Sequence, residues 1–108
     1  MNKIDVVYLQ DMKEAMIQIA LYTEDVTFEE FSNDQMRQDA TIRQLEILGE
    51  AANKLSSEFA HNYHELPLRQ VISMRNFLIH GYDEVDLQIV WDTIQQNIPE
   101  LKKILEAL

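Results

Sequence analysis

Hydrophobic residues recur at helical spacing through most of the first 80 positions. Apolar stripes backed by polar residues predict helices over 5–23, 33–60 and 67–80. Between the first two, Thr27-Phe-Glu-Glu30 has the pattern of a capping box, which is typical of the start of a short helical turn. This part of the chain is therefore expected to be a series of amphipathic helices.

The remaining residues predict a further helix after Gly81, a residue that suits a helix C-terminus. Asp83 or Asp86 is expected to cap this helix. Pro99 is expected to kink or restart the chain, and apolar positions then continue to residue 108. The stripe at i, i+3, i+4, i+7 and i+11 that predicts the helix consists of Leu87, Val90, Trp91, Ile94 and Ile98.

Glycine and proline are scarce, with two of each among 108 residues, which argues against the many turns of a sandwich or barrel. Together with the stripes, this scarcity predicts a single all-α domain over 1–108, an antiparallel up-and-down bundle of four to five helices. Gly49 falls inside the helix predicted over 33–60, where glycine costs about 1 kcal/mol relative to alanine. We expect it to allow the close approach of another backbone.

The charge balance is strongly acidic: nine Lys and Arg against 19 Asp and Glu give a formal net charge of −10 at pH 7. This charge opposes broad binding to nucleic acid, because counterion release needs cations clustered against phosphate, although a local basic pocket stays compatible with it. The absence of cysteine excludes disulfides and thiolate zinc sites and favours a reducing, cytoplasmic setting. No sequence window approaches the length of a membrane span, so we expect no membrane partner.

The most unusual segment is the helix predicted over 67–80, in which Arg75 and Asn76 lie among Val, Ile, Met, Phe and Leu and which ends at His80. A charged guanidinium in such surroundings is costly unless it is paired or hydrated. Histidine can move a proton to or from the ribose oxygens at a phosphodiester, and arginine can stabilise the charge that builds on the phosphate. Asn76 would orient the histidine or a phosphate oxygen, and Tyr82 would stack on a base or donate a hydrogen bond. These residue types suit phosphodiester cleavage without a metal or other cofactor.

Helical geometry limits how these groups can meet. Arg75 and His80 are five residues apart, about 500° of rotation, so they do not share a face of a straight helix, whereas Asn76 and His80 do. Either the helix loosens near His80, or two copies of the chain meet. A twofold dimer of this helix would bring Arg75, Asn76 and His80 of both chains into one cleft.

A purely structural interpretation stays open beside the catalytic one. Arg75 would then pair with Glu46 or Glu50 of the preceding helix, and one of these carboxylates is also our expected orienting partner for Arg75 in the catalytic case. His80 would cap the carbonyls at its helix end, and Tyr82 would simply pack.

Three sequence blocks together are similar to one known family. They are Met74-Arg75-Asn76-x-x-x-His80-Gly81-Tyr82, the following Val85 to Leu101 run with its Ile-Val-Trp element, and Ile42-Arg-Gln-Leu-Glu-Ile-Leu-Gly-Glu-Ala-Ala52. This combination resembles the HepT-like group of HEPN-domain proteins, toxins of the HepT/MntA toxin–antitoxin family. The matching blocks cover roughly residues 40–108.

The resemblance implies a homodimeric, HEPN-like helical bundle that acts as a metal-independent endoribonuclease toxin of a type VII toxin–antitoxin system. The family's catalytic arginine and histidine fall on Arg75 and His80, its supporting polar residue on Asn76, and its motif tyrosine on Tyr82. The implied partner is a minimal nucleotidyltransferase antitoxin, which would silence the toxin by AMP transfer to Tyr82. The two proteins could also assemble into a hetero-oligomer. The alternative is a catalytically weak HEPN binding module that docks this partner or a nucleotide, which the net charge of −10 favours over RNA cleavage.

Overall fold

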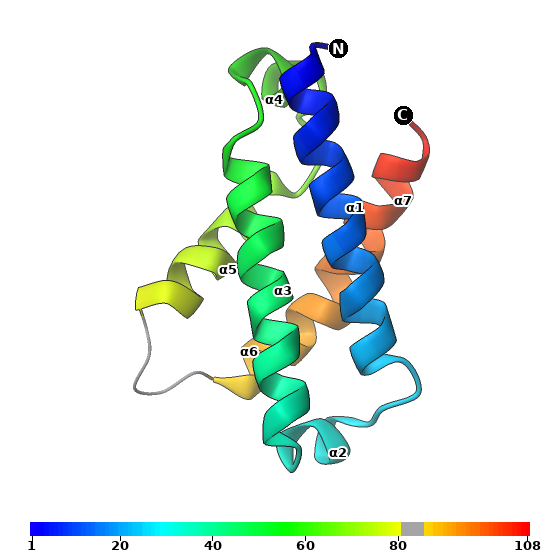
Figure 1. Cartoon of the computed structure of the whole chain (residues 1–108), viewed down its shortest axis with the longest axis vertical. Coiled ribbons are helices and arrows are strands. Elements are labelled where there is room, and N and C mark those ends of the chain that lie inside the picture. Colours follow the sequence, from blue (N-terminus) through cyan, green and yellow to red (C-terminus); the bar gives the residue numbers. More distant parts are fainter. Residues whose placement is uncertain (81–85) are drawn as a thin grey trace.

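The computed structural model describes residues 1–80 and 86–108, and the side chains of all of these except Ile79 and His80. Within these residues the chain is helical and contains no strand, which confirms the all-α prediction (Figure 1). None of the described helices is long and apolar enough to cross a membrane.

Two long helices form the centre of the bundle: α1 (Lys3–Thr23) and α3 (Gln35–Asn53). They run antiparallel side by side in Figure 1 and pack against each other along their length. Their contact buries an apolar stripe from each helix, as the sequence pattern predicts. The buried side chains include Leu9, Met12, Met16 and Ile19 of α1 and Leu45, Leu48, Ala51 and Ala52 of α3.

The short helix α2 (Phe28–Ser32) connects α1 to α3 and confirms the predicted capping box. The Thr27 hydroxyl accepts a hydrogen bond from the Glu30 N–H at 3.1 Å, and the Thr27 N–H donates to the Glu30 carboxylate at 3.0 Å. This backbone donor, followed by the Thr27 side chain, lowers the pKa of Glu30 from its ordinary value. The capping box therefore fixes the start of α2, between the two long helices.

The single helix predicted over 33–60 is wrong, because the structure divides it into α3 and α4 (Ser57–Asn62). Ser56 adopts an extended backbone conformation, and its hydroxyl caps α4 by accepting from the Phe59 N–H at 3.0 Å. The buried Asp5 carboxylate accepts from the Ser56 N–H at 2.8 Å and from its hydroxyl at 2.6 Å. The helix breaks here because the Ser56 N–H donates to Asp5, whereas in an uninterrupted helix it would donate to the carbonyl four residues earlier.

Helix α5 (Leu68–His80) follows Pro67 and matches the predicted helix to within one residue at its start. It crosses α3 at an angle in Figure 1 and makes extensive contact with it. Its inner side contributes Val71, Met74 and Leu78 to the core. Helix α5 is therefore held on the bundle mainly by α3.

The C-terminal helical run consists of α6 (Leu87–Asp92), a π-helical turn η1 (Thr93–Asn97) and α7 (Ile98–Glu106). Asp86 is the observed cap of α6, and the alternative candidate Asp83 lies outside the described residues. The predicted kink at Pro99 takes the form of the wide turn before it, in which the Ile98 N–H donates to the Thr93 carbonyl five residues back. A proline has no N–H to continue the α-helical ladder, and the wide turn accommodates this loss.

Candidate active site

The site predicted at Arg75 lies on α5 where this helix packs directly against Gly49 of α3. Arg75 and Gly49 are in direct contact: a Cβ at Gly49 would overlap the Arg75 Cβ and lie 2.9 Å from the Arg75 Cγ. The same Cβ would be 3.1 Å from the carbonyl oxygen of Val71. Gly49 therefore permits the close backbone approach that its place inside a helix predicted, and that approach fixes the base of the Arg75 side chain.

The Arg75 guanidinium is half-buried and makes one hydrogen bond, from Nη1 to the Asn76 Oδ1 at 3.0 Å. Its Nε is buried and has no hydrogen-bond partner among the described residues. A guanidinium carries five N–H donors, so most of its hydrogen-bonding capacity faces no acceptor in the described parts of the chain. Such a group is suited to bind an incoming anion.

The prediction that Glu46 or Glu50 pairs with Arg75 is wrong. Glu46 pairs with Arg43 at 3.3 Å, and Glu50 pairs with Lys54 at 3.3 Å. In both pairs the partners are three or four positions apart along α3 and its C-cap. Such a pair forms on one helix, so neither carboxylate has to reach across to α5. Among residues 1–78 and 86–108, Arg75 has no carboxylate partner, so the structural interpretation loses its proposed ion pair.

Asn76 has a contact that sequence reasoning missed. Its Oδ1 accepts a hydrogen bond from Arg75, and its expected role of orienting the histidine or a phosphate oxygen stays a prediction. The two residues are adjacent in sequence, and adjacent side chains on a helix point about 100° apart, so their pairing was not expected. The base of the Arg75 side chain lies against Gly49, and its guanidinium points toward the neighbouring Asn76.

The other two predicted residues are less fully described. His80 is the last residue of α5, and its side chain lies outside the described part of the structure. Tyr82 lies outside the described residues altogether. The helical register of the α5 backbone places position 80 one turn beyond Asn76 and about 500° from Arg75. The roles of His80 and Tyr82 remain predictions.

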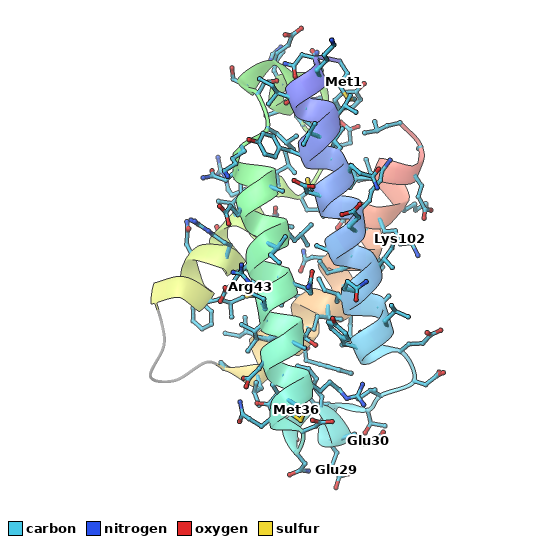
Figure 2. All side chains as sticks on the ribbon, viewed as in Figure 1. Met1, Glu29, Glu30, Met36, Arg43 and Lys102 are labelled. Atoms are coloured by element: carbon cyan, nitrogen blue, oxygen red, sulfur yellow. The ribbon has the colours of Figure 1, made fainter. Side chains whose placement is uncertain are left out.

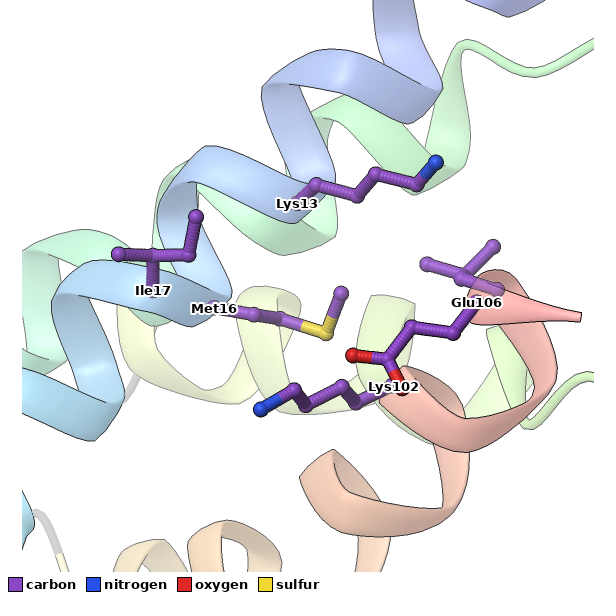
Figure 3. A pocket seen from close by; sticks show the side chains of 6 residues that line it. Lys13, Met16, Ile17, Lys102 and Glu106 are labelled. Carbon is purple, nitrogen blue, oxygen red and sulfur yellow. The ribbon is translucent and has the colours of Figure 1, made fainter.

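A hollow elsewhere in the bundle is a competing candidate. It lies between α1 and α7, has a volume of about 330 Å³, and is lined by Lys13, Met16, Ile17, Lys102, Leu105 and Glu106. Figure 3 shows Lys13 and Ile17 reaching it from α1, and Lys102 and Glu106 from α7. The lining holds no histidine or hydroxyl nucleophile, so it lacks the groups that phosphodiester cleavage needs.

Comparison with protein-family models gives a match to the family described as "Ribonuclease HepT-like" over residues 12–108. The chain belongs to the HepT-like ribonuclease family. "Probable ribonuclease HepT" of Thermococcus cleftensis is 41% identical over 101 residues, covering 94% of this chain and 92% of that protein. "Putative RNase MJ1380" of Methanocaldococcus jannaschii is 34% identical over 109 residues, covering 100% of both chains. No solved structure matches the chain.

Membership of the HepT-like family confirms the resemblance drawn from the three sequence blocks, all of which lie inside the matched residues. The HepT-like match also spans α3 and α5, so it includes both sides of the Gly49–Arg75 contact.

Proposed function

We propose that this protein is a cytoplasmic, metal-independent endoribonuclease toxin whose active site is formed by Arg75 and His80 across a homodimer. The observation that carries the proposal is the Arg75 guanidinium, which is fixed at its base by Gly49 and has no carboxylate partner among the described residues. A positioned guanidinium that is not paired with a carboxylate is available to bind a phosphate.

Each residue has a defined role in the proposed reaction. His80 removes the proton from a ribose 2′-hydroxyl, and the freed oxygen attacks the adjacent phosphorus while the 5′-oxygen leaves and takes up a proton. Arg75 donates hydrogen bonds to the phosphate oxygens as negative charge builds on them. Asn76 holds Nη1 of Arg75 at 3.0 Å and so sets the plane of the guanidinium. Products with a cyclic 2′,3′-phosphate and a free 5′-hydroxyl follow from this sequence of steps.

The helical register supports a site made by two chains. Within one copy of α5, positions 75 and 80 point in directions about 140° apart. Two copies of α5 related by a twofold axis can instead present position 75 of one chain and position 80 of the other to the same phosphate.

Mixing two inactive variants tests this shared site. Arg75→Ala and His80→Ala homodimers are each expected to cleave RNA far more slowly than the wild type, by about 100-fold or more. Mixed dimers are expected to regain cleavage, because they keep one intact Arg75 and one intact His80 in the shared cleft. The measurement is cleavage of an end-labelled RNA, in EDTA, after subunit exchange. Failure to regain cleavage in dimers shown to have exchanged would place both groups within one chain.

The catalytically weak binding module is the second candidate, and the net charge of −10 favours it. Wild-type dimer that binds RNA or a nucleotide without cutting any RNA would support this candidate. An assay of RNA cleavage and RNA binding by the wild-type protein therefore distinguishes the two functions, before any variant is made.

We also propose that a minimal nucleotidyltransferase antitoxin controls the toxin. The Tyr82 phenol oxygen would attack the α-phosphorus of ATP, lose its proton and release pyrophosphate, which leaves AMP joined to tyrosine through a new P–O bond. The added phosphate is negatively charged and lies two residues from His80, so it would repel RNA from the cleft. Family membership supports this part of the proposal.

Modification of Tyr82 is expected to need both the partner and this residue. Co-expression with a cognate nucleotidyltransferase is expected to add AMP to the chain and to suppress its ribonuclease activity. Mass spectrometry of the peptide containing residue 82 is the measurement. Tyr82→Phe should abolish the mass increase, whereas Tyr63→Phe, a control at a half-buried tyrosine on the described surface, should retain it. An AMP group found on another residue would contradict the assignment.

A further inference from the structure

Helix α5 is a cationic segment in an acidic protein. From Leu66 to Tyr82 the sequence contains no Asp or Glu, although the whole chain has 19 of them. The same stretch contains Arg69 and Arg75. The helices α1, α3 and α7 each contain acidic residues, and Figure 2 shows Glu29 and Glu30 projecting from α2 at one end of the bundle. The negative charge is therefore unevenly distributed, and α5 is free of it.

The outer side of α5 presents a row of polar side chains. Arg69, Ser73 and Asn76 are all exposed and are spaced four and three residues apart. This spacing brings Arg69 to within about 20° of Asn76 around the helix and about 10 Å from it along the axis. The α5 backbone continues to position 80 one turn further on. The row thus leads from Arg69 directly to the proposed catalytic end of the helix.

Arg69 differs from several other basic residues of the protein in having no carboxylate partner in the described parts of the chain. Arg37, Arg43 and Lys54 each pair with an acidic residue three or four positions away. Glu65 lies four positions before Arg69 but precedes α5 and forms no ion pair with it in the described structure, so the charge of Arg69 is left to the solvent. An exposed arginine without a local partner keeps its full capacity to bind a phosphate.

We propose that the outer face of α5, defined by Arg69, Ser73 and Asn76, is the binding strip for the RNA backbone, and that Arg69 binds a phosphate next to the one that is cleaved. This inference rests on the proposed function, since it takes RNA as the substrate. The strip binds a single flexible strand through its phosphates and does not read bases. It also gives a chain of net charge −10 a place to hold RNA, because α5 itself contains two arginines and no Asp or Glu.

Salt dependence of RNA binding tests the strip separately from catalysis. Binding of a fluorescent single-stranded RNA is measured over a range of salt concentrations in the His80→Ala protein, so that cleavage does not interfere. Adding Arg69→Ala is expected to weaken binding about tenfold and to reduce the slope of log K against log salt by about 0.7 for each phosphate that the protein no longer binds. Arg69→Lys should largely keep the slope. In the cleaving protein, Arg69→Ala should raise KM and leave kcat unchanged.

Arg43→Ala is the matched control, because Arg43 is also exposed but lies on α3 and pairs with Glu46. It is expected to leave both the affinity and the salt slope unchanged. An unchanged slope in Arg69→Ala, an equal reduction in Arg43→Ala, or a fall in kcat alone would each overturn the proposal. Absence of cleavage by the wild-type protein would contradict the proposed function instead, and the binding measurement would still decide whether the strip exists.

Discussion

His80→Ala is expected to lower kcat for RNA cleavage by about 100- to 10,000-fold, the contribution that a positioned general acid or base makes to such a reaction. The effect should appear in kcat, since the imidazole acts on protons in the transition state and contributes little to holding the RNA. The measurement is single-turnover cleavage of a labelled RNA with enzyme in excess. In cells, the same variant is expected to lose its ability to arrest growth.

His61→Ala provides the control for this prediction. His61 is an exposed histidine on α4 and has no proposed role, so its removal should leave kcat and growth arrest unchanged. Cleavage that persists at the wild-type rate in His80→Ala would remove His80 from the mechanism. Equal reductions in both histidine variants would point to a general effect on the protein rather than to proton transfer.

Gly49→Ala is expected to impair both stability and catalysis through Arg75. Alanine favours a helix by about 1 kcal/mol over glycine. Its Cβ, however, would overlap the Arg75 Cβ and crowd the Val71 carbonyl oxygen, and neither atom can move away by a simple side-chain rotation. Overpacking of this kind costs about 1–3 kcal/mol, so a net fall in the free energy of unfolding is expected. Because α5 must then move relative to α3, a fall in kcat of about 100-fold is also expected.

A double-mutant cycle separates the two effects of Gly49→Ala. If Gly49 acts by positioning Arg75, then Gly49→Ala combined with Arg75→Ala should cleave no more slowly than Arg75→Ala alone. Val90→Ala, at a fully buried site in α6, is the control for reduced stability and should keep kcat near the wild-type value. Multiplicative effects in the double variant, or a kcat unaffected by Gly49→Ala, would contradict a positioning role.

Features that depend on local sequence were predicted well. The limits of α5 and the capping box at Thr27 each depend on residues within a few positions of one another, whereas at Pro99 a kink or restart was predicted and not the π-helical turn that precedes it. Gly49 was identified for a similar reason, since a glycine inside a helix is costly unless another backbone approaches it. The sequence did not show that this approach comes from Arg75, because a stripe pattern does not specify which turns of two helices meet.

Features that depend on distant residues were predicted poorly. The break between α3 and α4 follows from the bonds between Ser56 and Asp5, which are 51 positions apart, while the apolar spacing continues across it through Leu55 and Phe59. The expected pairing of Arg75 with a carboxylate of α3 failed because partners nearer in sequence took both candidates. The candidate residues of the site could thus be predicted from the sequence, whereas the partners of their side chains became clear only from the structure.

The π-helical turn at Thr93–Asn97 has a consequence for chain length in this family. A π-helical turn holds about one residue more than an α-helical turn over the same stretch of axis. A relative with an ordinary α-helical turn here would need one residue fewer to direct Leu101 and Leu105 into the core, as they are in this protein. Deletion of a single residue at this point would therefore leave the packing of α7 intact, even though the same change elsewhere in a buried helix would rotate every residue after it by about 100°.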